Sequence, residues 1–177
     1  MKSILLILVG SAVAWGAPLA DPPVGLWQSY NGEWGHVSQQ LVLLAEAIPA
    51  EKFDWRPASG VRLTSEVFLH IAVSNFGLLS VTGPALPADL RSAHLEKVKS
   101  KPELITRLKR SLEAVRNAHA GLASTELQRK VQISNREATV EGIYLRILIH
   151  ANEHMGQLIA FARMNGIVPP WSEEGKR

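Results

Sequence analysis

The sequence predicts an all-α protein whose main domain is a four-helix bundle. Four long segments carry apolar residues three and four positions apart, and proline or glycine residues separate these segments. The 177 residues include no cysteine, and a chain of this length can bury one core without disulfides. Hydrophobic residues make up 46% of the chain and charged residues 20%, which is typical of a globular protein. We therefore expect one helical domain over residues 28–172 and a polar tail over 173–177.

The first 16 residues have the pattern of a cleavable signal peptide. Lys2 precedes an apolar run over residues 4–13, which is too short to span a bilayer because a spanning helix needs about 20 apolar residues. Ala14 and Gly16 supply the small residues of a cleavage site. The sequence therefore predicts an exported protein, periplasmic or extracellular, with a linker over residues 17–27 and no membrane span after cleavage. A retained N-terminal anchor is the alternative.

The first two helices are predicted over residues 28–47 and from Thr64 to the Gly83–Pro84 pair. Apolar residues of the first lie on one helical face: Trp34, Val37, Leu41, Leu44 and Ile48. A proline then ends it. Thr64 is a suitable N-cap for the second helix, and Glu66 in the first turn complements the helix dipole.

The last two helices have recognisable ends. Pro102 suits the first turn of the third helix, and Gly121 is expected to close it just after its last helical residue. For the fourth helix, predicted over residues 135–165, Ser134 and Glu137 have the spacing of a capping box. The connections are too long for the sequence to fix the topology.

Histidines on two of these helices form a candidate metal site. His150 and His154 lie four residues apart, so their Cβ atoms stack about 5–6 Å apart on one helical face. His70 lies near the middle of the second helix, beside its apolar stripe. Three converging imidazoles would leave a coordination position open, as in catalytic metal sites. Each could instead be a core histidine hydrogen-bonded to its neighbours.

The sequence around these histidines resembles the DinB-like (DinB/YfiT) superfamily. Residues 139–172 contain HANEHMGQL and MNGIVPPW, and residues 48–75 contain IPAEKFDWRP and EVFLHIAVSN. The resemblance covers essentially the whole mature chain. It implies a four-helix bundle that binds nickel or zinc through His70, His150 and His154, and it implies a metal-dependent hydrolase or a thiol S-transferase. Many members of the superfamily have no assigned reaction, and the predicted export departs from its mostly cytoplasmic pattern.

Glu153 and Gln157 are the candidate catalytic residues. The H-x-x-E-H pattern is that of inverzincin peptidases, with Glu153 as general base. Such a peptidase needs a carboxylate ligand well downstream, and only the tail glutamates follow. Glu153 also points about 100° away from His154 around the helix, so a solvated residue is the alternative. Gln157 could orient a ligand or contact substrate, or it could make a plain interhelical hydrogen bond.

The remaining histidines have ordinary surroundings. His119 falls on the apolar face of the third helix near its C-terminus, where the helix dipole favours it. A second reading is that His119 lines the candidate metal site. His36 and His94 are expected at the surface. The chain has no dense basic stripe with interleaved aromatic residues, which argues against nucleic acid as a partner.

Two functions therefore remain open. The chain is an enzyme acting on a small molecule, or it is a non-catalytic metal-binding module in which the ion stabilises the fold. An open coordination position that faces groups such as Gln157 or Tyr144 would favour the enzyme. The sequence leaves open whether the chain is a monomer or a homodimer.

Overall fold

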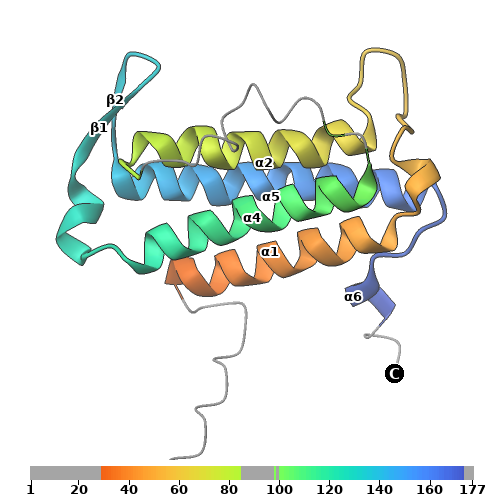
Figure 1. Cartoon of the computed structure of the whole chain (residues 1–177), viewed down its shortest axis with the longest axis horizontal. Helices are drawn as coiled ribbons and strands as arrows, with labels where there is room; N and C mark the ends of the chain where they lie inside the picture. The colour runs from red at the N-terminus through yellow and green to blue at the C-terminus, as the bar shows by residue number, and fades with distance from the viewer. Residues whose placement is uncertain (1–28, 85–97, 99, 174–177) are drawn as a thin grey trace, which may run out of the picture.

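The computed structural model describes residues 29–84, 98 and 100–173, and these residues are mostly helical (Figure 1). The long helices are α1 (Ser29–Ala47), α2 (Thr64–Val81), α4 (Lys101–Ala120) and α5 (Val140–Met164). Shorter elements complete the fold: 3-10 turns at Ala50–Lys52 and Ser124–Gln128, strands β1 (Lys130–Ile133) and β2 (Arg136–Thr139), and helix α6 (Pro170–Glu173). The predicted signal peptide, the linker and residues 174–177 lie outside the described residues.

The four long helices pack side by side around one core, so the predicted helical fold is confirmed (Figure 1). Helix α2 packs against α4 and α5, and α1 packs against the same two helices from the other side. Helices α1 and α4 are antiparallel, because His119 at the end of α4 lies 2.8 Å from Asn31 at the start of α1, and Lys101 at the start of α4 donates to the Glu46 carbonyl at the end of α1 at 2.8 Å. Helix α2 runs antiparallel to α5 (Figure 1). In this arrangement α2 and α5 are in direct contact.

The start of α2 differs by one residue from the prediction. Its N-cap is Leu63, whose amide nitrogen donates to the Glu66 carboxylate at 2.7 Å. Thr64 is the first helical residue instead, because its hydroxyl donates to the Trp55 carbonyl at 3.1 Å and so ties the preceding loop to the helix. Glu66 therefore acts in the first turn as expected, whereas Thr64 does not cap the helix.

Helix α4 begins as predicted and ends slightly differently. The Ser100 hydroxyl accepts from the Glu103 amide at 3.4 Å, and Pro102 lies in the first turn. Gly121 is itself the C-cap, with a right-handed φ of −84°, because its amide bonds to the Asn117 carbonyl within the last helical turn. The position predicted for Gly121, one residue beyond the cap, is therefore wrong.

A β-hairpin replaces the predicted start of the last helix. Ser134 and Asn135 form its two-residue turn, and their φ angles of 47° and 62° are those of a type I′ turn. Glu137 pairs with Gln132 across the hairpin, and helix α5 starts only after Thr139, whose hydroxyl accepts from the Gly142 amide at 3.1 Å. The capping box at Ser134 is therefore wrong, because the Ser-Asn pair adopts the left-handed backbone that this turn requires.

Helix α2 is long and strongly apolar. By length and composition alone it could cross a membrane, and it is the one such helix among the described residues. In the bundle 44% of its residues are buried, and the core helix of a bundle meets the same criterion.

Candidate metal centre

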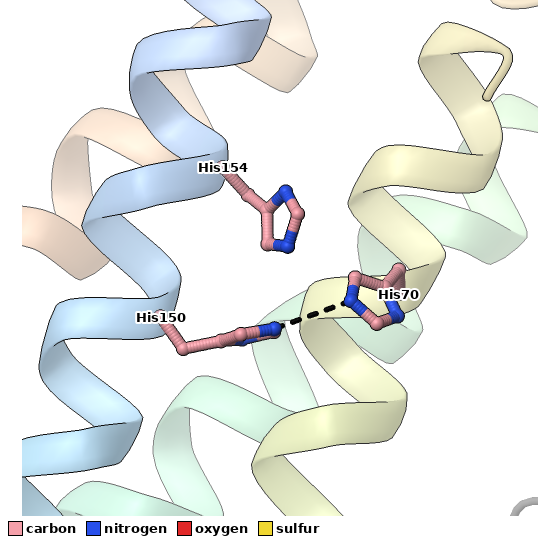
Figure 2. A group of neighbouring side chains, drawn as sticks. All are labelled: His70, His150 and His154. Atoms are coloured by element: carbon pink, nitrogen blue, oxygen red, sulfur yellow. Dashed lines mark hydrogen bonds between the residues drawn. The ribbon is translucent and has the colours of Figure 1, made fainter. Parts of the chain in front are cut away.

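Three histidine side chains converge between α2 and α5 (Figure 2). His70 comes from the second turn of α2, whereas His150 and His154 come from successive turns in the middle of α5. The ring centroid of His70 lies 4.9 Å from that of His150 and 4.7 Å from that of His154. The centroids of the two rings on α5 are 4.6 Å apart. The structure therefore brings together the three residues that the sequence singled out.

The spacing of the ring nitrogens suits a single metal ion. One nitrogen from each ring lies within 4.8 Å of the other two, and Nε2 of His70 is 3.2 Å from Nε2 of His150. Two nitrogens bound to one tetrahedral zinc ion at ~2.0–2.1 Å are about 3.3 Å apart. The His70–His150 pair already has this separation, which also allows a hydrogen bond between two neutral rings.

Gln157 holds the third ring in place. Its Oε1 lies 3.0 Å from Nδ1 of His154, within the same helix. When Nδ1 carries the proton, it donates to this oxygen and leaves the Nε2 lone pair free to bind an ion. The orienting role foreseen for Gln157 therefore has a geometric basis, whereas an interhelical hydrogen bond does not.

Burial keeps two of the imidazoles neutral. His150 is only 8% exposed, and desolvation lowers its pKa to about 4, with His154 and His70 adding to the effect. Desolvation also lowers the pKa of His70, and the positive charge of Arg62 acts in the same direction. Neutral imidazole is the form that binds metals, so these rings need not lose a proton at neutral pH before binding an ion.

Glu153 is next to His154 in the chain but does not belong to the three-histidine group. Its side chain is 53% exposed, and its Oε2 and Oε1 lie 3.2 and 3.5 Å from the two terminal nitrogens of Arg146. Arg146 and Glu153 are four residues before and three residues after His150, so their ion pair spans that residue. Within the described part of the chain no carboxylate joins the histidine group, which removes support for an inverzincin site.

His119 and Tyr144 belong to a different cluster, near the start of α1. The His119 ring stacks on Tyr30 at 4.2 Å and meets Tyr144 edge-on at 4.9 Å. Nδ1 of His119 lies 2.8 Å from the Asn31 side-chain oxygen. Neither residue therefore lines the three-histidine group, and the second reading of His119 is wrong. His36 is partly buried and not fully exposed as expected, and His94 lies outside the described residues.

Comparison with known proteins gives a family and a set of related folds. A family model described as the DinB superfamily matches residues 34–158. A search of curated proteins found no match.

Three solved structures are similar over most of their length. A DinB-like protein from Bacillus cereus has a TM-score of 0.71 at 17% identity, covering 80% of this chain and 93% of its own. A DinB-like protein from Bacillus subtilis has a TM-score of 0.63 at 18% identity, covering 77% and 91%. A structure assigned to the DinB family from Exiguobacterium sibiricum has a TM-score of 0.63 at 24% identity, covering 78% and 90%. At these identities the likeness shows a shared fold.

The contact between Gln157 and His154 predicts a loss of metal affinity when the amide is removed. We expect Gln157→Leu to weaken zinc binding by ~10–100-fold, because the ring loses the partner that fixes its tautomer. Gln157→Glu should retain binding, since a carboxylate accepts the same hydrogen bond. Competition with a zinc-chelating dye measures both. Asn152→Leu is the matched control, because it removes an amide from an exposed position of α5. Equal affinity in Gln157→Leu and the wild type would contradict this role.

The low pKa of His150 predicts how stability depends on pH in metal-free protein. The ring has a pKa of 6.5 when unfolded and about 4 when folded, so between these values the unfolded chain binds more protons. The free energy of unfolding should therefore decrease as the pH falls from about 6.5 towards 4. Urea unfolding after removal of metal measures this dependence, and His150→Gln should make it shallower. An unchanged dependence in that variant would count against the assignment.

Proposed function

The chain belongs to the DinB superfamily, and from that membership and its three-histidine group we propose that it binds one divalent metal ion through His70, His150 and His154. The observation that carries the proposal is the convergence of three imidazole nitrogens, from two helices, within 4.8 Å of one another. Imidazole suits zinc, nickel, copper and iron, so the donor atoms alone do not select the metal. Zinc or nickel is proposed on the family resemblance.

We favour a catalytic role for this ion over a structural one. Structural zinc sites are normally closed by four protein ligands, whereas this group supplies three and two of its rings are partly exposed. The bundle also has an extensive apolar core drawn from all four long helices, with such fully buried members as Trp34, Leu41, Phe68, Leu108 and Ile147. A core of this size is sufficient for a domain to fold without a metal.

The activity proposed is that of a metal-dependent hydrolase or thiol S-transferase on a small molecule. A divalent ion in the group would act as a Lewis acid towards the substrate. Gln157 orients His154, and the buried His150 stays unprotonated. Glu153 is half exposed beside the group, so its carboxylate is accessible as a proton acceptor. These roles use side chains that approach the group from α5.

Metal content tests the proposed ligands directly. Wild-type protein should bind about one zinc or nickel ion per chain. His70→Ala, His150→Ala and His154→Ala should each lower the affinity by more than ~100-fold, because losing a ligand costs more than losing an outer hydrogen-bond partner. Elemental analysis after gel filtration gives the stoichiometry, and His36→Ala on α1 serves as the control. Equal metal content in all four variants would refute ligation by the three histidines.

We also propose that the protein is exported, on the basis of Lys2, the apolar run over residues 4–13 and the small residues Ala14 and Gly16. Material recovered from the periplasm or medium should begin after Gly16. Intact-mass measurement checks this, and Ala14→Leu should slow cleavage because the site requires a small residue there. Exported material that retains residues 1–16 would contradict cleavage.

A further inference from the structure

The three histidines are neutral ligands, and this limits which molecules can bind beside an ion that they hold. The inference rests on the proposed metal site. All three members are imidazoles, and none of the described carboxylates joins them. A divalent ion held by neutral ligands keeps its full positive charge. An anion that enters the remaining coordination position therefore gains more than a neutral molecule of the same shape.

Two arginines add positive charge around the same group. Besides desolvation, the guanidinium of Arg62, just before α2, lowers the pKa of His70. Arg146, one turn before His150 on α5, acts on the pKa of His150 in the same direction, after desolvation and the neighbouring histidines. For Arg146 the geometry agrees, because its guanidinium pairs at 3.2 Å with Glu153, the residue next to His154 in the chain, and the negative charge of Glu153 opposes its effect on His150.

The ion pair between Arg146 and Glu153 is loosely held. Its two nitrogen–oxygen distances, 3.2 and 3.5 Å, exceed the ~2.7–2.9 Å of a strong charge-assisted hydrogen bond. The side chains are 49% and 53% exposed, and ion pairs in such surroundings contribute little to stability. A second anion can therefore replace Glu153 on the guanidinium at small cost.

We propose that the site selects small carboxylate anions, which are bound jointly by the ion on the three histidines and by the Arg146 guanidinium. The Arg146–Glu153 pair spans His150, so the guanidinium is held within about one helical turn of that ring. When the anion binds, Arg146 exchanges the carboxylate of Glu153 for that of the ligand. Arg146 is therefore the specificity-determining residue, and Glu153 competes with the ligand for it.

Acetate and acetamide provide a matched pair of probes, since they have the same shape and differ in charge. Each is titrated into full-length mature protein loaded with Co²⁺ at low ionic strength, and the visible absorption of the cobalt reports binding. Arg146→Gln should weaken acetate binding by ~3–10-fold, because one screened charge is lost, and should leave acetamide unaffected. Glu153→Gln should tighten acetate binding by a similar factor. Arg163→Gln, exposed in the last turn of α5, is the control and should change neither.

The outcomes separate the two proposals. If the wild type and the variants all fail to bind Co²⁺, the metal site itself is overturned, and the anion selectivity with it. If Co²⁺ binds and acetate binds the wild type and Arg146→Gln equally, the metal site stands and the role of Arg146 is wrong. A Glu153→Gln variant that binds acetate more weakly than the wild type would overturn the exchange between the two carboxylates.

Discussion

The antiparallel packing of α2 against α5 is the constraint on which the site depends. His70 and His150 are 80 residues apart, and no local rule of chain geometry brings them together. The buried apolar residues beside them bring the two histidines together: Ile71 on α2 and Ile147 and Ala151 on α5 are all fully buried in the core. These side chains belong to one close-packed core, so sliding or rotating either helix against the other would open cavities or cause overlaps there, and this fixes their register. The 3.2 Å separation of the two Nε2 atoms is a consequence of that register.

The same bundle shows that burial alone does not make a histidine a ligand. Both His119 and His150 have a lowered pKa because they are desolvated. His119 has a polar partner in Asn31, while Tyr30 stacks on its ring and Tyr144 meets it edge-on. Nδ1 of His150 has no hydrogen-bond partner among the described residues, while its Nε2 faces a second imidazole. The Nε2 of His150 and the Nε2 of His70 are close enough to share one ion, whereas the Nδ1 of His119 faces an amide oxygen, so the surroundings of His150 suit an ion and those of His119 do not.

Helical periodicity was sufficient to predict the four long helices, because each buries one continuous face. It also placed His150 and His154 on the same face, since that relation depends only on a spacing of four. The meeting of His70 with this pair came from the family resemblance, because spacing within one helix carries no information about its partner. The hairpin was missed because Ser134 and Glu137 fit a capping box as well as a turn and a strand, and local propensity could not choose between them. The hairpin end of the bundle is fixed by a distant contact, Arg129 with the Thr82 carbonyl at 2.6 Å.

The H-x-x-E-H pattern shows how one spacing supports two different chemistries. Along a helix, residue 153 lies about 100° from residue 154 and about 60° from residue 150, so its side chain is displaced to one side of the two histidines. Arg146 lies on that side as well and reaches it across two turns. Glu153 is thereby held at the margin of the group, where it acts on His150 through its charge and on Arg146 through an ion pair. A carboxylate ligand would have reduced the charge of a bound dication. Because the carboxylate stays at the margin, a dication in the proposed metal site would keep its full charge, and the charge of an entering ligand would then be the property by which such a site discriminates.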